Sequence, residues 1–526
     1  MRSQVASTLL LASTISAFQW PFNLPWFSSA QPDQLVLEAH EPEVPRTPRI
    51  AVIGAGPGGA SATYWLSLAK ARGNLSFEVD LYERSDYIGG RSTVVYPYGN
   101  TNYPHVEVGG SIYVPGNLNM MRATEEFQLE RVQPGAGMHN EIGFWNGKDF
   151  VFRMETSGVG SWWGNFKAVW RYGIAAPRDL KAKVDTMLKT FMTLYDQDFG
   201  SFDTVSEAVT KLELGDAVAQ SATEYLDSAN IGTAYTREIV DAATRVNYGT
   251  DLEDIHGFGA LVCMSASSKT YSTKDGNYKI FESFVNASDA HVFLRTPVTK
   301  LSKVQTGWEL ATSTKTTLYD AVVLAAPLQF SDIKFASALT TKIPEIPYVH
   351  LHVTLFTTTA KYPSSEYFGT AAPRTVLTTH DGARHGGPEP EFNSLSYLHP
   401  LQEGAEEWVV KIFSKKRISD TWLEKAFDGK VGWVYRKEWE AYPALKPRAL
   451  DTLPSLNPDE GLYYVNAFEP FVSTMETETV ASRNVVELLL RHHFKSSICP
   501  VSDKKTSDES TDEPRPTAPF VYGFDC

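Results

Sequence analysis

Short apolar runs alternate with longer amphipathic segments through most of this chain. Residues 49–53 and 77–82 are apolar and short, which predicts buried strands, and residues 60–71 between them have the apolar spacing of a helix. Another apolar run at residues 321–325 predicts a further buried strand. The same reasoning predicts helices at residues 179–195 and 479–492. Strands interleaved with helices indicate an α/β protein.

Both ends of the chain depart from this pattern. Residues 1–17 combine Arg2, an apolar stretch and small residues up to Ala17, which is typical of an export signal cleaved after Ala17. An uncleaved, frayed N-terminus is the alternative. Residues 18–47 are rich in Pro, Trp and acidic side chains and are interpreted as a linker or pro-segment. Residues 496–526 are interpreted as a flexible tail, and whether residues 520–522 dock onto the fold stays open.

Length and charge narrow the functional classes. With 526 residues the chain is too long for one compact core, so interlocked domains are expected. A net charge of −14, without any cluster of Lys and Arg, excludes nucleic acid as a partner. Beyond the N-terminal signal no apolar run is long enough for a transmembrane segment, while peripheral membrane contact stays open. The expected location is the secretory pathway, ending in a lysosome, a vacuole or the extracellular space.

Cysteines and glycosylation sequons agree with export. Cys499 and Cys526 bracket the C-terminal tail and are free to pair, whereas Cys263 lies in an apolar stretch and is expected to be a buried thiol. Asn74 and Asn286 begin the two sequons and are candidate glycosylation sites. No spacing of Cys and His resembles a metal site, so no metal is expected.

The strongest motif is an apolar strand that leads into three spaced glycines. Gly54 permits a tight turn, Gly56 lets the backbone approach a pyrophosphate, and Gly59 lets helix and strand pack closely. The second strand ends at Glu83, whose carboxylate suits ribose hydroxyls and repels a 2′-phosphate. This context predicts dinucleotide binding, and the alternative is a glycine-rich turn without a ligand.

Two later segments favour FAD over NAD. Gly90 and Arg91 follow Glu83, as a Gly-Gly-Arg segment does in FAD oxidases of the glutathione-reductase and amine-oxidase types, where the arginine offers a donor fork to phosphate. Gly110 lies where such oxidases have a loop that approaches the flavin ring. A surface arginine and a plain turn are the competing interpretations.

Distant segments complete the expected FAD domain. Backbone groups at Val298, in an expected strand over residues 294–301, are predicted to meet the adenine end. Glu469 is predicted to end a strand and to contact the ribityl or pyrophosphate region. Near Glu476 a helix begins, and its dipole is predicted to face the flavin carbonyl edge. The alternative interpretation is that Glu469 and Glu476 are ordinary surface acids.

Five segments in the middle of the chain carry distinctive motifs, namely residues 162–173, 244–249, 257–260, 264–266 and 276–277. With them the chain resembles a known family, the FAD-dependent prenylcysteine oxidases (prenylcysteine lyases), over residues 49–491. One departure is Asp275, which stands where the family has the first glycine of a Gly-Gly-Asn turn, and this departure bears on the substrate more than on the cofactor.

The resemblance implies an oxidase that uses FAD and O₂ to cleave the thioether of farnesyl- or geranylgeranyl-cysteine, giving prenyl aldehyde, cysteine and H₂O₂. Such chemistry needs no nucleophile and no metal. Trp162, Phe166 and Trp170 share one side of a helix and are candidates for the prenyl pocket, or an ordinary core face. His350 shares a strand face with His352 and is a weak catalytic candidate, a solvated strand face being the alternative.

Two further hypotheses stay open. One is an FAD oxidase of the same fold for another small substrate, such as an amine or a biosynthetic intermediate. The other is a lumenal protein that binds flavin or lipid with little turnover. The expected architecture is amine-oxidase-like: a Rossmann-type FAD-binding domain (residues 48–135, 291–330 and 451–495) interleaved with a mixed substrate domain, helical over residues 136–290 and sheet-like over residues 331–450.

Overall fold

The first apolar strand, helix and second strand form the centre of a parallel sheet in the computed structural model, which describes residues 46–134, 141–155, 167–266, 269–500 and 519–526. Five strands run in the order β20-β13-β1-β2-β9, all parallel. The predicted strands at 49–53, 77–82 and 321–325 are confirmed. The bounds are β1 (Arg49–Ile53), β2 (Glu78–Tyr82), β9 (His291–Phe293), β13 (Ala321–Leu324) and β20 (Leu462–Tyr464).

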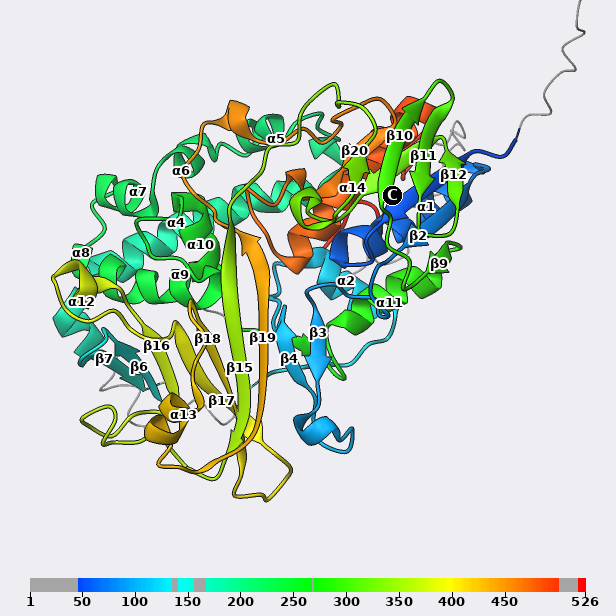
Figure 1. Cartoon of the computed structure of the whole chain (residues 1–526). Coiled ribbons are helices and arrows are strands. Elements are labelled where there is room, and N and C mark those ends of the chain that lie inside the picture. The colour runs from blue at the N-terminus through cyan, green and yellow to red at the C-terminus, as the bar shows by residue number, and fades with distance from the viewer. Residues whose placement is uncertain (1–45, 135–140, 156–166, 267–268, 501–518) are drawn as a thin grey trace, which may run out of the picture. The chain divides into compact units, whose positions relative to one another are not determined.

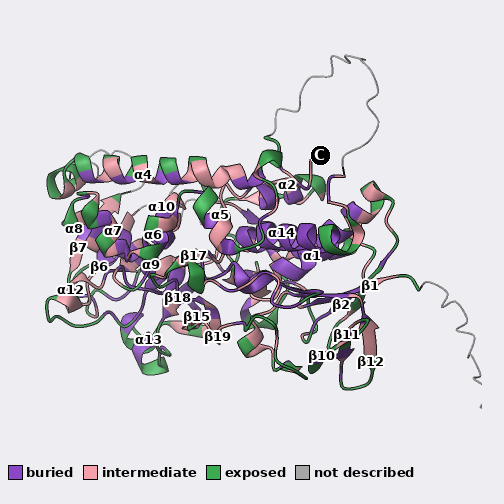
Figure 2. Ribbon diagram, turned by 90° about the horizontal axis from the view of Figure 1, so that it is seen from above, coloured by how far each residue is buried: buried purple, intermediate pink, exposed green. Residues whose placement is uncertain are grey.

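Two long helices pack together against this sheet. They are α1 (Pro57–Gly73) and α14 (Met475–Phe494), and both are buried along most of their length (Figure 2). Thr474 begins α14 with a capping box, because its side chain accepts a hydrogen bond from the Thr477 N–H and the Thr477 side chain accepts one from the Thr474 N–H. The order of the sheet and the position of α1 are those of a Rossmann fold, as predicted.

A small second sheet follows β9, and here one predicted strand needs correction. Its order is β12-β11-β10-β14, with β10 (Lys300–Val304), β11 (Gly307–Ala311), β12 (Thr316–Tyr319) and β14 (Lys334–Phe335). The strand expected over residues 294–301 begins only at Lys300. Residues before it follow the end of β2 instead, where the Thr296 N–H donates to the Glu83 carbonyl.

The substrate domain is built on a seven-stranded mixed sheet in the order β19-β15-β18-β17-β16-β6-β7. Neighbouring strands are antiparallel except β16 and β6. Figure 1 shows its two longest strands, β15 and β19, beside the ribbon formed by β3 and β4. The bounds are β3 (Thr93–Val95), β4 (Val106–Gly109), β6 (Glu141–Trp145), β7 (Phe150–Glu155), β15 (Tyr348–Thr358), β16 (Thr375–Thr378), β17 (Ser394–Pro400), β18 (Trp408–Ser414) and β19 (Val431–Pro443).

Helices supply much of the rest of the fold, and two of them, α2 and α11, pack on α14 and α1 of the Rossmann domain. The helix predicted at 179–195 is confirmed as α4 (Ala175–Phe191), continued by a 3₁₀ turn to Tyr195. No helix among the described residues is long and apolar enough to cross a membrane. The other helices are α2 (Leu118–Glu126), α5 (Val205–Lys211), α6 (Gly215–Ala219), α7 (Ala222–Ser228), α8 (Thr233–Tyr235), α9 (Asp241–Tyr248), α10 (Gly257–Ser265), α11 (Tyr278–Ala287), α12 (Asp381–Arg384) and α13 (Asp420–Ala426).

The C-terminus returns to the Rossmann domain, so residues 519–526 dock onto the fold, a point that the sequence left open. Cys499 and Cys526 form a disulfide, and Cys263 is a buried free thiol. The Phe524 ring packs edge-on against Trp65 of α1, with ring centroids 5.0 Å apart. Arg72 donates to the carbonyls of residues 523 and 524 at 2.8 Å each. Residues 1–45 and 501–518, with the expected signal and linker, lie outside the described residues.

Candidate active site

A cavity of about 580 Å³ lies at the carboxyl edge of the parallel sheet, where α1 begins. Gly54, Gly56, Gly90 and Gly110 line it. A Cβ at Gly54 would lie 2.6 Å from the Ala325 carbonyl oxygen, and Gly54 has a φ of +101°, so only glycine fits there. At Gly59, which packs behind the cavity, a Cβ would lie 1.7 Å from the Gly54 carbonyl oxygen. The glycines therefore shape a turn that leaves the N-terminus of α1 open to an anion.

Glu83 lines this cavity from the end of β2. Its Oε2 accepts a hydrogen bond from the Ala55 N–H at 2.8 Å, and its Oε1 accepts one from the Ser85 N–H at 2.7 Å. These bonds fix the carboxylate while each oxygen keeps a further lone pair for a ribose hydroxyl. Val298 also lines the cavity, next to the end of β2.

Arg91 and Glu469 contact each other, which the sequence does not predict. One terminal nitrogen of Arg91 donates to the Ala441 carbonyl at 2.7 Å, and the other pairs with Glu469. Glu469 is fully buried, also accepts from the Tyr348 hydroxyl, and does not line the cavity. It lies beyond β20 and a 3₁₀ turn instead of ending a strand. Arg91 lines the cavity, and each terminal nitrogen of its guanidinium donates one hydrogen bond to the protein and keeps a second N–H.

Asn466 and Glu478 supply the polar groups that sequence reasoning missed in this cavity. Both are buried and line it, and both Asn466 Oδ1 and Glu478 Oε1 lack a protein partner. Burial, together with the charge of Glu469, raises the pKa of Glu478 well above its usual value, so this carboxyl can donate as well as accept. Orphaned polar atoms beside an open helix N-terminus fit a bound dinucleotide, which would satisfy them.

Glu476, the other predicted acid, faces away from this cavity. Its carboxylate caps α2 by accepting from the Asn119 and Met120 N–H groups at 2.8 and 2.9 Å, and it accepts from the Tyr195 hydroxyl at 2.6 Å. Burial raises its pKa to about 7. Glu476 thus joins α14 to α2, while Met475, at the start of α14, lines the cavity.

A second cavity of about 730 Å³ adjoins the first. Most of its wall is apolar and comes from β4, α9, α10 and the large sheet, including Val108, Val246, Val262, Leu351 and Phe413. Residues shared by the two cavities mark where a cofactor would meet a substrate. They are Arg91, Gly110, Trp439, Ala441, Tyr442, Ser473, Thr474 and Met475.

The second cavity contains two neighbouring ionisable groups, the buried Lys411 of β18 and the half-buried Glu107 of β4. Lys411 Nζ donates to the Glu107 carbonyl at 2.7 Å and to Ser111 Oγ at 2.8 Å. Glu107 Oε1 accepts from the Asn277 N–H at 2.6 Å, whereas its Oε2 is buried without a partner. Because Ser111 follows Gly110, this pair lies beside the shared boundary of the two cavities.

Burial brings the pKa values of Lys411 and Glu107 toward each other. It lowers the pKa of Lys411 to about 8 and raises the pKa of Glu107 to about 8, and the attraction between the two opposes both shifts. Below this pH the pair is an ammonium with a carboxylic acid and carries a charge of +1. Above it the pair is an amine with a carboxylate and carries −1. His105 and His399 also line the cavity, and burial lowers the pKa of both, so they are neutral at this pH.

Asp275 and Asn277 lie in one turn, which approaches the second cavity through Glu107 and Gly110. Asp275 has a φ of +67°, a left-handed conformation that Asp tolerates better than most residues. Asn277 accepts from the Thr273 N–H and donates to the Gly110 carbonyl, both at 2.7 Å. With aspartate at position 275, the turn supports Glu107 and Gly110 through Asn277.

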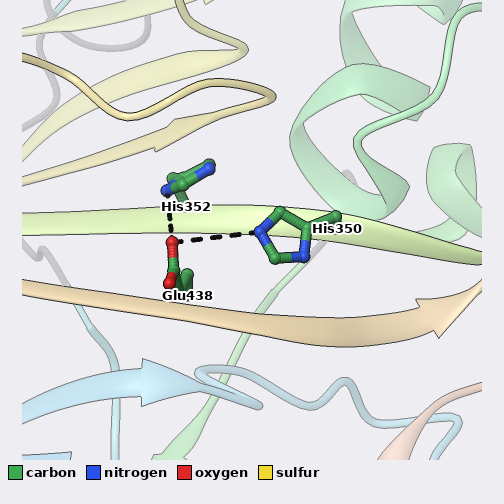
Figure 3. Close-up of side chains that lie close together, drawn as sticks. All are labelled: His350, His352 and Glu438. Atoms are coloured by element: carbon green, nitrogen blue, oxygen red, sulfur yellow. Dashed lines mark ion pairs between the residues drawn. The ribbon is translucent and has the colours of Figure 1, made fainter.

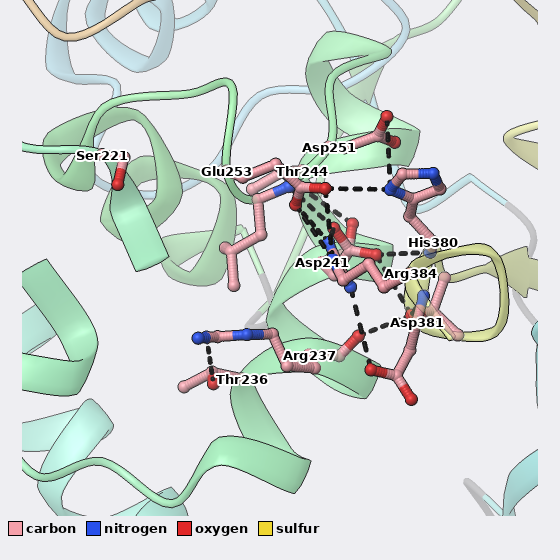
Figure 4. A network of polar contacts seen from close by, with 12 residues as sticks. Ser221, Thr236, Arg237, Asp241, Thr244, Asp251, Glu253, His380, Asp381 and Arg384 are labelled. Carbon is pink, nitrogen blue, oxygen red and sulfur yellow. Dashed lines mark hydrogen bonds and ion pairs between the residues drawn. The ribbon is translucent and has the colours of Figure 1, made fainter. Parts of the chain in front are cut away.

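A polar network fixes α9, which contributes residues 246–248 to the second cavity. Asp241, fully buried at the start of α9, accepts from the His380 N–H at 2.6 Å and from Arg384 at 2.9 Å. Arg384 also pairs with Glu253 (Figure 4). The network joins α9 to α12, at the end of β16, and so holds one wall of the cavity against the large sheet.

Comparison with known proteins assigns this architecture to a family. Residues 155–504 match the prenylcysteine lyase family, and residues 52–127 match the NAD(P)-binding Rossmann-like domain. The chain belongs to the prenylcysteine lyase family. It is 29% identical to farnesylcysteine lyase of Arabidopsis thaliana, covering 87% of this chain and 91% of that one, and 28% identical to human prenylcysteine oxidase 1, covering 85% and 89%.

Solved structures agree on the fold. Putrescine oxidase aligns with a TM-score of 0.55 at 14% identity, over 84% of this chain and 99% of that one. Cyclohexylamine oxidase aligns with a TM-score of 0.54 at 16% identity, over 85% and 100%. The amine-oxidase-like architecture is confirmed. As a prenylcysteine lyase family member with a Rossmann sheet, the chain is an FAD-dependent oxidoreductase, and FAD is its cofactor.

Three aromatic residues are predicted from the sequence to line the substrate pocket. Two of them, Trp162 and Phe166, lie outside the described residues. Trp170 is 87% exposed and lines neither cavity, so its pocket assignment needs correction. His350 and His352 share one strand face, as predicted, while Leu351 between them faces the second cavity. His350 therefore points away from the substrate side of β15.

Proposed function

We propose that this protein oxidises the thioether of a prenylated cysteine, taking up O₂ and water and releasing prenyl aldehyde, cysteine and H₂O₂. The observation that carries the proposal is an apolar cavity that meets the cofactor cavity beside one acid–base pair, Lys411 and Glu107. A prenyl chain needs the apolar wall, and a cysteine carboxylate needs buried hydrogen-bond donors. The names of the relatives in Arabidopsis thaliana and human agree with this substrate class.

The protein's own residues orient the substrate. The Lys411 ammonium and a protonated Glu107 Oε2 both donate toward a carboxylate, and Ser111 holds Lys411 in place. The prenyl chain then lies along Val246, Val262 and Leu351. This directs the carbon between sulfur and the double bond toward the boundary at Gly110 and Met475, where the cavities meet. FAD, when bound, supplies a two-electron acceptor there, and O₂ reoxidises it.

The reaction balances without a nucleophilic side chain. The carbon next to sulfur loses a hydride, water adds to that carbon, and the resulting hemithioacetal collapses with C–S cleavage to aldehyde and thiol. Each turnover consumes one O₂ and one water. Neutral His105 and His399 line the same cavity and are available to accept the proton that water loses.

Incubation with farnesylcysteine tests the proposal directly. Flavin bleaching under anaerobic conditions is expected, and H₂O₂, farnesal and free cysteine are expected in equal amounts once air is admitted. Flavin reduction by primary amines, with none by farnesylcysteine, would instead establish an amine oxidase. A protein that binds farnesylcysteine without flavin reduction would be a carrier.

The Lys411–Glu107 pair predicts a pH dependence of binding. Because the charge of the pair changes from +1 to −1 as pH rises through about 8, affinity for a carboxylate ligand should fall across this range. Lys411→Met should weaken binding at pH 7 by about 10–100-fold, the range expected for a hydrogen bond to a charged group, and should flatten the pH profile. S-farnesylthiopropionate is the suitable probe, since it has the carboxylate but no titrating amine.

Lys416→Met provides a matched control, because Lys416 is exposed on the same segment. Its binding and pH profile should equal those of the unmodified protein. If Lys411→Met kept the pH dependence of binding, the Lys411–Glu107 pair would not contact the carboxylate of the ligand. Affinity that rises with pH would favour a cationic substrate.

We also propose that the protein enters the secretory pathway and is glycosylated. Asn74 and Asn286 are both exposed, at the ends of α1 and α11, so both sequons are accessible. Expression in a glycosylating host should give a product that begins near residue 18 and loses mass on glycosidase treatment. Ser76→Ala should remove one glycan while keeping Asn74, whose φ of +48° favours asparagine. An intact Met1 without glycan would contradict the proposal.

A further inference from the structure

Two histidines and a glutamate lie together on the outer face of the large sheet. His350 and His352 come from β15, and Glu438 comes from the neighbouring strand β19 (Figure 3). Strand register places Glu438 opposite His352 and Glu440 opposite His350. Neither histidine lines the cavities of the active site, because the side chain between them, Leu351, takes that face.

The distances among these side chains match a metal-binding group. Glu438 Oε2 lies 3.9 Å from His350 Nε2 and 3.5 Å from His352 Nδ1. The ligand atoms of all three residues lie within 4.8 Å of one another. Tetrahedral zinc with bonds of about 2.0–2.1 Å separates its ligand atoms by about 3.4 Å, so small side-chain rotations would suffice.

Glu440 supports this arrangement from outside the ligand group. Its Oε1 lies 2.9 Å from His350 Nδ1, and a proton on that nitrogen leaves Nε2 as the free lone pair directed at Glu438. Carboxylate partners of this kind orient metal-bound imidazoles in proteins. The carboxylates of Glu438 and Glu440 also compensate the charge of a divalent ion. Arg417 is a further cation near His352.

We propose that His350, His352 and Glu438 bind a divalent transition metal ion of the zinc and copper type. Imidazole suits such ions, whereas calcium and magnesium prefer oxygen ligands. The side chains are half-exposed or more except for His352, so water completes the coordination sphere. Bound metal links β15 to β19 on the face opposite the substrate.

A second group of similar composition shows what distinguishes this site. Asp251, His380 and Glu389 also place their ligand atoms within 4.8 Å of one another. Asp251 already pairs with Lys415 at 2.7 Å and with Arg245. A metal ion there would have to displace two cations, so the group serves as an internal comparison and not as a second site.

Titration with ZnCl₂ tests the proposal on the full-length FAD-loaded protein, purified without a histidine tag and stripped with EDTA. Calorimetry should show about one equivalent bound with micromolar or tighter affinity, and the melting temperature should rise at saturation. His350→Ala and His352→Ala should each weaken binding at least about 10-fold, and Glu440→Gln about 10-fold, as for outer-sphere partners. His380→Ala, in the comparison group, should leave the Zn²⁺ affinity unchanged. Circular dichroism and cooperative thermal unfolding verify that each variant is folded, because Glu440 also lines the FAD cavity and flavin content is therefore not an independent check.

Copper provides a spectroscopic readout that does not depend on stability or turnover. The electron paramagnetic resonance spectrum of bound Cu²⁺ should show hyperfine coupling to two imidazole nitrogens. In His350→Ala it should show coupling to one imidazole nitrogen. The chain has 12 histidines, so other residues could bind metal adventitiously. Equal Zn²⁺ affinity in the double variant H350A/H352A, or no saturable binding by the unmodified protein, would overturn the proposal.

Discussion

Gly56→Val should give a folded protein that contains no flavin. The backbone at Gly56 has φ −74° and ψ −171°, which any residue adopts, and a Cβ there would meet only the Gly90 Cα at 3.8 Å. The substitution is therefore tolerated by the protein itself. Its side chain would instead project into the cavity at the start of α1, where the pyrophosphate of FAD is predicted to bind.

Flavin absorbance per protein and thermal unfolding measure the two effects separately. Cofactor content should fall by at least about 10-fold, while the apoprotein still unfolds cooperatively. Gly215→Val is the matched control, because a Cβ at Gly215 would make only ordinary contact with Leu450 at 3.7 Å. Normal flavin content in Gly56→Val would place the cofactor elsewhere.

The cofactor-binding half of the fold was predictable because its signals are local. The strand at 49–53, the glycines and Glu83 lie within one continuous segment, and each has a steric or hydrogen-bonding requirement that residue type alone satisfies. The structure adds that Gly59 cannot carry a Cβ at all, since it would meet the Gly54 carbonyl.

Roles that depend on distant partners were not predictable in this way. Arg91 has the expected position, yet Glu469, far along the chain, takes one end of its guanidinium. Glu476 lies at the start of the predicted helix, but α2 claims its carboxylate through Asn119 and Met120. No sequence pattern reveals which of two nearby acids, Glu476 or Glu478, will face a cavity.

The sequence contains a signal for the Lys411–Glu107 pair of the second cavity. Glu107 lies between Val106 and Val108, and Lys411 follows Val409 and Val410 in an apolar strand. A single charge within a buried strand requires a partner or a function, because unpaired burial is costly. The pairing itself could not be predicted, since it depends on β4 meeting β18.

The length of the prenyl chain should dominate substrate efficiency. Each buried CH₂ contributes about 0.8 kcal/mol, so a five-carbon isoprene unit contributes at most about 4 kcal/mol. A cavity of about 730 Å³ with an apolar wall is large enough for a chain of several such units. Anaerobic flavin reduction, measured at low equal concentrations, should therefore be about 10- to 1000-fold slower with geranylcysteine than with farnesylcysteine, and slower still with S-ethylcysteine.

A substitution in the apolar wall should reverse this preference. Val262→Trp adds an indole from α10 to the apolar wall of the second cavity and should slow reduction by farnesylcysteine more than reduction by S-ethylcysteine. Val292→Trp, on the partly exposed strand β9, is the matched control and should leave both rates unchanged. Equal rates for the farnesyl and ethyl substrates in the unmodified protein would show that the cavity does not hold the prenyl chain. A length preference that survives Val262→Trp unchanged would place the chain along another part of the wall, because a buried tail has to compete with the new side chain for the same space.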